Sequence, residues 1–140
     1  MTRRRHIRII ATGGTIAGRG GSATSVEYTA AQLSADELVS MVSGLGDVAD
    51  ISCETLYALD SKDMGLKHWR ALANLIRKRL SEKSIDGVVV THGTDTLEET
   101  AWFLDLAGSW RKPVVIVGAM RASTALSADG PANLYHCLLY

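Results

Sequence analysis

A stretch in the middle of the chain, VVVTHGTDTLEET at positions 88–100, combines side chains that can carry out a hydrolysis. An apolar run leads into a histidine, two threonines and an aspartate, which is more polarity than a simple turn requires. A hydroxyl nucleophile needs a base within hydrogen-bond reach and donors for the developing oxyanion. Thr94 is therefore a candidate nucleophile. Asp95 is a carboxylate that can assist it or hold a cationic part of a substrate.

A second candidate nucleophile, Thr15, follows the two glycines that end an apolar run near the N-terminus. Paired glycines allow a sharp turn and leave space beside the backbone. Tyr28, in the loop after this turn, is a candidate proton acceptor. Taken alone, the glycine turn also fits a plain connection or a phosphate cradle. It matches neither the Walker A loop nor the spaced-glycine dinucleotide motif.

Two more loops, Asp60-Ser61 and Gly118-Ala119-Met120-Arg121, also place small polar residues after apolar runs. In open parallel sheets, ligands bind beyond the carboxyl ends of the strands. We therefore expect all four loops to meet at one edge of a sheet and to form a site there.

Each candidate residue also has a purely structural interpretation. Thr94 or Asp95 suits the N-cap of the following helix, and Asp129 suits the cap of the last one. Tyr28 can be an ordinary loop aromatic, and we interpret His92 as a structural histidine. From the residues alone, the sequence indicates an α/β protein with a small-molecule site, and a hydrolase is one option.

Apolar runs separated by glycine, proline and polar residues predict alternating strands and helices. Strands are expected at 6–12, 48–56, 87–91 and 113–118. Helices are expected at 34–44, 65–83 and 97–110, and from position 131 onward. The first of these helices begins with a capping box formed by Ser34 and Glu37. Residues 17–30 lack apolar periodicity and are expected to form a long loop.

The strands are continuous apolar runs, a pattern typical of a parallel sheet buried on both faces. The expected fold class is α/β, an open and mostly parallel sheet with helices on both faces, of the three-layer flavodoxin-like or Rossmann-like type. The chain stops within the apolar run Leu138-Leu139-Tyr140. This favours a domain at 1–140 that is truncated before a second domain, although a helix docked at the C-terminus also fits.

Composition limits the possible partners. The 140 residues are 46% hydrophobic, and 15 basic side chains balance 15 acidic ones. A neutral chain is not expected to bind nucleic acid or an anionic membrane electrostatically, so Arg3-Arg4-Arg5 is interpreted as a solvated tail. No apolar run reaches the roughly 20 residues of a membrane span. Cys53 and Cys137 fit no metal-ligand spacing and indicate a reducing, cytoplasmic setting.

The motifs TGGTIAG at 12–18 and HGTDTLEET at 92–100 together resemble the two signatures of the bacterial-type L-asparaginases, including the asparaginase-glutaminases. GAMR at 118–121 and SADGPANL at 127–134 are also similar to that family's pattern. The resemblance covers essentially the whole chain, and four blocks in order make it specific. It implies the N-terminal domain of an enzyme that hydrolyses L-asparagine to L-aspartate and ammonia without a metal or an organic cofactor.

The resemblance also implies roles for individual residues. Thr15 resembles the nucleophile that forms an acyl-enzyme, and Tyr28 resembles its activating partner and part of a lid. Thr94 resembles a second catalytic group near the attacked amide. Asp95 resembles the group that holds the substrate's α-ammonium, and Ser61 the group that binds its α-carboxylate. The residues expected to bind the substrate are Gly14, Ser61, Lys62, Thr94 and Asp95.

The chain also departs from the family pattern. The family's catalytic lysine and its C-terminal domain, which completes a neighbour's active site in a dimer of dimers, lie beyond residue 140. Lys62 stands where many members carry glutamine or glutamate, and we expect it to face solvent. Ala122 stands where proline is common. L-Glutamine stays open as a further substrate. The alternatives are a related amidase subunit, such as a component of a transfer-RNA-dependent amidotransferase, and a non-catalytic module that binds a small amino acid.

Overall fold

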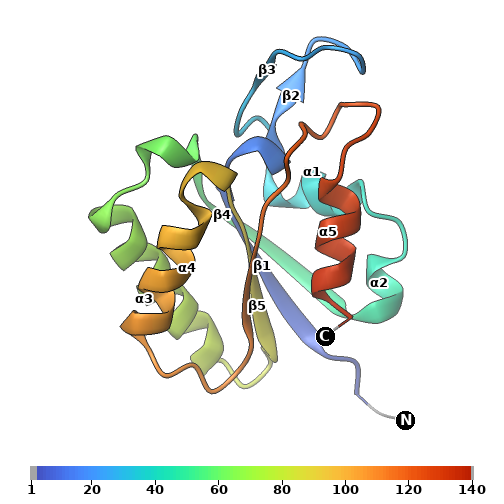
Figure 1. Ribbon diagram of the computed structural model, residues 1–140. Coiled ribbons are helices and arrows are strands. Elements are labelled where there is room, and N and C mark those ends of the chain that lie inside the picture. Colours follow the sequence, from blue (N-terminus) through green and yellow to red (C-terminus); the bar gives the residue numbers. More distant parts are fainter. Residues whose placement is uncertain (1–2, 140) are drawn as a thin grey trace.

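The computed structural model describes residues 3–139 and is built on a sheet of four parallel strands (Figure 1). The strand order is β4-β1-β5-β6. The bounds are Asp50–Leu59 for β4, His6–Gly13 for β1, Gly87–Thr91 for β5 and Val114–Val117 for β6. Every residue of β5 is buried, as expected for a central strand covered on both faces.

Helices cover both faces of this sheet (Figure 1). One face carries α1, α2 and α5, with bounds Ala35–Ser40, Leu45–Val48 and Gly130–Cys137. The other face carries α3 and α4, with bounds Leu66–Ser81 and Leu97–Ala107. The expected three-layer α/β fold is therefore confirmed. In the described range 3–139, no helix is long and apolar enough to cross a membrane.

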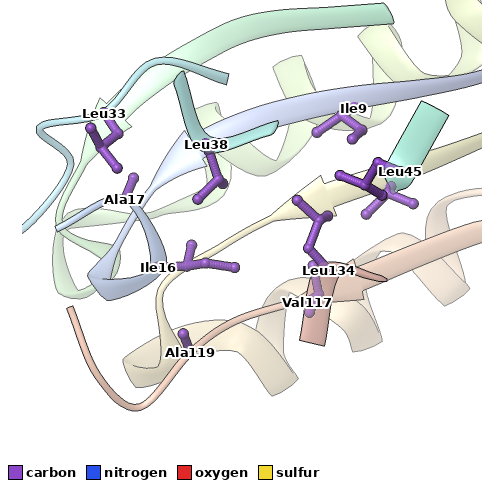
Figure 2. Packing of buried hydrophobic residues seen from close by; sticks show 10 residues of the cluster. Ile9, Ile16, Ala17, Leu33, Leu38, Leu45, Val117, Ala119 and Leu134 are labelled. Atoms are coloured by element: carbon purple, nitrogen blue, oxygen red, sulfur yellow. The ribbon is translucent and has the colours of Figure 1, made fainter. Parts of the chain in front are cut away.

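Two buried clusters hold the layers together, because neighbouring residues of a strand point to opposite faces. Ile9 of β1 packs with Leu38, Leu45 and Leu134 beneath the first group of helices (Figure 2). The next residue, Ile10, packs beneath the second group. Its cluster contains Leu72, Ala73, Ile76, Val88, Val90 and Leu104.

Several expected boundaries were wrong for local reasons. The capping box of α1 is present, but the helix ends at Ser40 instead of Gly44. Gly44 adopts a left-handed conformation, with φ 84°, and starts the short helix α2. Because α2 occupies Leu45–Val48, the second strand begins at Asp50 instead of 48. It ends at Leu59 instead of 56. Helix α4 ends at Ala107 instead of 110.

The segment 17–30 is not a structureless loop. It contains a small antiparallel hairpin of β2 (Arg19–Gly20) and β3 (Tyr28–Thr29). The basic N-terminal residues are exposed, as expected, but they are not a free tail. The Arg3 guanidinium lies 2.6 Å from a carboxylate oxygen of Asp86. Both corrections reflect long-range contacts that a local pattern does not encode.

The connectivity creates a binding edge between β1 and β5. The chain leaves β1 toward α1 on one face, whereas it leaves β5 toward α4 on the opposite face. Two neighbouring strands whose connections diverge in this way leave a crevice beyond their carboxyl ends. The polar loops after β1 and β5 border this crevice.

Candidate active site

The loops after β1 and β5 meet through two glycines. Gly14 has φ 76° and ψ −172°, a conformation essentially restricted to glycine. A Cβ atom on Gly14 would lie 2.2 Å from the Cα atom of Gly93. A Cβ atom on Gly93 would lie 2.4 Å from the Ser61 hydroxyl oxygen. Close backbone approach therefore brings three of the expected loops together.

Thr15 and Tyr28 form a hydroxyl pair beside this contact. The Oγ1 atom of Thr15 lies 2.8 Å from the Oη atom of Tyr28, and either hydroxyl can donate. Thr15 is 9% exposed, whereas Tyr28 is 45% exposed and covers it from the hairpin. The ring of Tyr28 packs close to Gly18, where a Cβ atom would meet its Cδ2 atom at 2.8 Å. The hydroxyls of the two candidates that family resemblance pairs, Thr15 and Tyr28, are therefore in direct contact.

Ser61 joins the same group of residues through Asp95 and Thr96. The backbone N–H of Asp95 donates to the Ser61 hydroxyl at 3.2 Å. The Thr96 hydroxyl donates to the Ser61 carbonyl at 2.8 Å. Ser61 is buried, but Asp95 is exposed. The backbone of an exposed aspartate is thus bonded to a buried hydroxyl.

The expectation that Thr94 or Asp95 caps α4 was wrong. Thr96 is the N-cap residue, and its side chain makes no capping bond. Thr94 and Asp95 instead form a short 3-10 turn, Thr94–Thr96, that precedes the helix. Thr94 is partly buried, and its methyl group would meet a Cβ atom on Gly118 at 3.2 Å. The loop after β6 therefore borders this side of the site.

His92 is fully buried and belongs to a chain of hydrogen bonds below the site. The Trp69 indole N–H donates to the Thr100 hydroxyl at 2.7 Å, and Thr100 lies 2.9 Å from the His92 Nε2 atom. The Thr100 hydroxyl accepts the indole hydrogen bond and donates to Nε2, because the Gly93 carbonyl beside Nδ1 can only accept and so the proton of the neutral ring lies on Nδ1. The Nδ1 atom then carries the proton and donates to the Gly93 carbonyl at 2.7 Å. Burial lowers the pKa of His92, so it acts as a neutral structural support, as the sequence indicated.

Lys62 lies at the rim and not inside the site. Its ammonium nitrogen lies 3.1 Å from a carboxylate oxygen of Asp60, and its side chain is 66% exposed. The hydrogen bond to Asp60, followed by the nearby charges of Asp60, Asp63 and Asp95, raises the pKa of Lys62. The expectation that Lys62 faces solvent agrees with this arrangement.

A shallow, open hollow of about 530 Å³ lies beside Tyr28. Its lining comprises Val26, Glu27, Tyr28, Ala30 and Asp60. Within residues 3–139, no group of three or more histidine, cysteine, aspartate or glutamate side chains is placed to hold a metal.

Sequence reasoning missed the residues that hold the hairpin in place. Ser123 and Thr124 bond to the hairpin backbone at Gly18 and Gly20. Asp129 occupies the N-cap position of α5, as expected, but makes no capping bond. Its carboxylate instead accepts from the backbone N–H groups of Met120 and Arg121, at 2.9 and 3.0 Å. No periodicity or turn signal in the sequence marks these contacts.

Known proteins resemble this chain in sequence over nearly its whole length. It is 50% identical over 134 residues to the "Probable L-asparaginase periplasmic" of Haemophilus influenzae, and 49% identical over 134 residues to "L-asparaginase 2" of Escherichia coli. It is 45% identical to the "Glutaminase-asparaginase" of Pseudomonas aeruginosa over 134 residues. These alignments cover 95–96% of this chain. The chain spans 37–38% of the length of these relatives.

The fold is similar to that of a solved structure, the "Probable Cytoplasmic L-asparaginase from Campylobacter jejuni". The TM-score is 0.92 at 49% sequence identity, covering 96% of this chain and 41% of that one. The model of the family described as "Asparaginase, N-terminal" matches residues 6–140. The chain therefore belongs to the asparaginase family, and it corresponds to the N-terminal domain of that family.

Proposed function

We propose that the complete protein hydrolyses L-asparagine to L-aspartate and ammonia, with Thr15 as the nucleophile. The observation that carries the proposal is the 2.8 Å contact between the Thr15 and Tyr28 hydroxyls, at the edge where the close approach of Gly14 and Gly93 also brings the loop of Asp95. A hydroxyl with a proton acceptor in reach is the arrangement that nucleophilic catalysis needs. Membership of the asparaginase family supports the choice of an amide as substrate.

In this proposal, the substrate is held by its two charged α-groups. The carboxylate of Asp95 pairs with the α-ammonium group, and the Ser61 hydroxyl binds the α-carboxylate. The absence of a side chain on Gly14 lets the Gly93 backbone approach closely, which brings the loop that carries Asp95 next to the loop that carries Thr15. Ser61 and Asp95 are already linked by a 3.2 Å hydrogen bond, so both contacts form on one preorganised unit.

The proposed reaction has two steps. The Thr15 oxygen attacks the side-chain amide carbon while the Tyr28 hydroxyl accepts the Thr15 proton and gives its own phenolic proton to the amide nitrogen. The C–N bond then breaks, ammonia leaves with that proton, and a Thr15 ester remains. Water hydrolyses the ester to L-aspartate and restores the Thr15 hydroxyl. The Thr94 hydroxyl assists near the attacked amide, together with a lysine that family resemblance places beyond residue 140.

Substituting phenylalanine for Tyr28 tests the proton-accepting role. Tyr28→Phe keeps the ring over Gly18 but removes the oxygen that contacts Thr15. We expect kcat to fall about 100-fold, the usual effect of losing a positioned general base. Steady-state kinetics of the complete protein with L-asparagine measure this. An unchanged kcat would contradict the role, and Tyr57→Phe, at a partly buried tyrosine whose ring packs on His68, is the control.

We further propose that residues 1–140 form the N-terminal catalytic domain of a longer chain and are inactive alone. The chain spans only 38% of the length of the H. influenzae and E. coli relatives, which supports this division. A protein limited to residues 1–140 is expected to release no ammonia from L-asparagine above the blank, whereas the complete protein does. Comparable turnover by both proteins would contradict the proposal.

L-Glutamine is the second candidate substrate, because the P. aeruginosa relative is named a glutaminase-asparaginase. Its side chain is one methylene longer than that of L-asparagine, a difference that typically changes specificity by about 10–200-fold.

We also propose that the complete protein is a homotetramer arranged as a dimer of dimers. Light scattering, which measures the molar mass in solution, tests this.

We propose a cytoplasmic location. Cys53 and Cys137 are free and partly buried, and burial raises the pKa of the Cys53 thiol to about 11. Unreactive, unpaired thiols suit a reducing compartment. The named relatives include both a cytoplasmic and a periplasmic protein. Fractionation of cells that express the complete gene separates these locations.

The function is tested by measuring ammonia release from L-asparagine and L-glutamine by the complete protein. We expect release from L-asparagine, with a lower kcat/KM for L-glutamine. Release from neither amide would overturn the proposal and favour a module that binds a small amino acid.

Asp95→Asn removes the negative charge that pairs with the α-ammonium group of the substrate, so it should raise the KM for L-asparagine.

A further inference from the structure

The hairpin that carries Tyr28 is bound by a segment about a hundred residues later in the chain (Figure 1). We define the lid as residues 18–29 and the clamp loop as residues 118–129. The N–H and the hydroxyl of Ser123 both donate to the Gly18 carbonyl, at 3.0 and 2.6 Å. The Gly20 N–H donates to the Thr124 hydroxyl at 2.8 Å. These bonds tie the start of the lid to the clamp loop.

A third contact ties the tip of the lid. The backbone N–H of Leu126 donates to the Ala23 carbonyl at 2.9 Å. The clamp loop is itself fixed at its base, since the Asp129 carboxylate accepts from two of its backbone N–H groups. The Asn133 amide of α5 adds a bond to the Gly118 carbonyl at 3.1 Å. The lid is thus connected through the clamp loop to a helix of the fold.

The lid needs these contacts with the clamp loop because few contacts within the lid stabilise it. Its two strands contain only the pairs Arg19 with Thr29 and Gly20 with Tyr28. Isolated two-stranded hairpins are marginally stable at best. Most residues from 19 to 29 are exposed, including Val26, which is 92% exposed. Few apolar contacts of the lid are therefore available to fix Tyr28.

The register of the hairpin connects the clamp loop directly to Tyr28. Gly20 is the residue paired with Tyr28, and Gly20 is also the residue whose N–H donates to Thr124. Ser123, which is 7% exposed, holds Gly18, against which the Tyr28 ring packs. Both hydroxyls of the clamp loop therefore act on the backbone that places the Tyr28 oxygen 2.8 Å from Thr15.

We propose that Ser123 and Thr124 are positioning residues that hold the lid closed, with Tyr28 on Thr15. The inference rests on the proposed function, because it assigns Tyr28 a role in the reaction. Neither residue touches Thr15, so both act through the lid backbone. A small displacement of a reacting group can reduce the rate by about 100-fold, which makes these hydrogen bonds relevant to turnover.

Hydrogen exchange of the Gly20 amide in the complete protein, read by NMR, tests the clamp without relying on activity. Thr124→Val keeps the shape but removes the acceptor, so Gly20 should exchange about fivefold faster, the effect of losing one hydrogen bond. Thr124→Ser restores an acceptor and should restore protection. Thr24→Val is the matched control, since Thr24 is exposed on the lid and its hydroxyl bonds only weakly, at 3.4 Å, to Ser22.

The same variants are then assayed with L-asparagine. Thr124→Val should lower kcat about tenfold through misplacement of Tyr28, and Thr124→Ser should recover most of it. Unchanged exchange at Gly20 in Thr124→Val would overturn the clamp, whatever the activity. If the unsubstituted protein is active, faster exchange at Gly20 together with an unchanged kcat in Thr124→Val would also overturn the positioning role. If the unsubstituted protein released no ammonia, the proposed function would fail, while the exchange result would still decide whether the clamp holds the lid.

Discussion

Replacing Thr15 with alanine is expected to abolish ammonia release from L-asparagine, with a fall in kcat of about 1000-fold or more. The substitution removes the oxygen that lies 2.8 Å from Tyr28, and no other hydroxyl occupies that position. Thr15→Ser keeps a hydroxyl and should retain part of the activity. Steady-state ammonia assays on the complete protein compare the three forms.

Thr12→Val is the matched control for this experiment. Thr12 is also buried and lies near the end of β1, just before the turn that carries Thr15, but its hydroxyl donates to the Thr91 carbonyl at 2.9 Å. Its loss should reduce stability by about 1 kcal/mol, the net value of one hydrogen bond, and leave kcat largely unchanged. If Thr15→Ala kept its activity, Thr15 would not be the nucleophile, and Thr94 would be the next residue to replace.

Replacing Gly14 with alanine should lower the free energy of unfolding by about 2–6 kcal/mol. Two effects add, since the backbone conformation is essentially restricted to glycine and the new Cβ atom would overlap Gly93. That atom would lie 2.2 Å from the Gly93 Cα atom and 2.3 Å from its nitrogen. Backbone atoms cannot move aside as a flexible side chain can. Urea unfolding of the complete protein at constant m-value measures the change.

Gly46→Ala is the control for added volume. Gly46 lies in the short helix α2, and a Cβ atom there would meet nothing within 4 Å. An alanine in a helix is favoured over glycine by about 1 kcal/mol, so this variant should be neutral or slightly stabilised. Equal urea midpoints for Gly14→Ala and the unsubstituted protein would contradict the close approach of the two loops.

The sequence predicted the central strands and their helices because those signals are local. The apolar run of β5 and the amphipathic stripe of α3 match their elements, although Leu66 of that stripe is 60% exposed. The capping box of Ser34 and Glu37 also forms as expected. The boundary near residue 44 shifted because Gly44 adopts a left-handed conformation that the hydrophobic pattern does not encode.

The candidate residues were found from the sequence by their types and by family resemblance, but their arrangement was not. Residue types show that Thr15 and Thr94 are hydroxyl-bearing and that Asp95 is a carboxylate. Only the fold shows that Tyr28 reaches Thr15 and that Asp95 is linked to Ser61. The roles of Thr94 and Asp95 as helix caps, which local rules favoured, were not realised, because a 3-10 turn precedes α4.

The sequence by itself determined the four strands of the main sheet, the main helices and the chemical groups that are present, because these depend on neighbouring residues along the chain. The tertiary structure decided which of those groups meet. The contact of Gly14 with Gly93 and the hydrogen bond of Gly20 to Thr124 join residues about eighty and a hundred positions apart. Such contacts depend on the strand order and on the faces that the helices cover, and no short segment of the sequence carries that information.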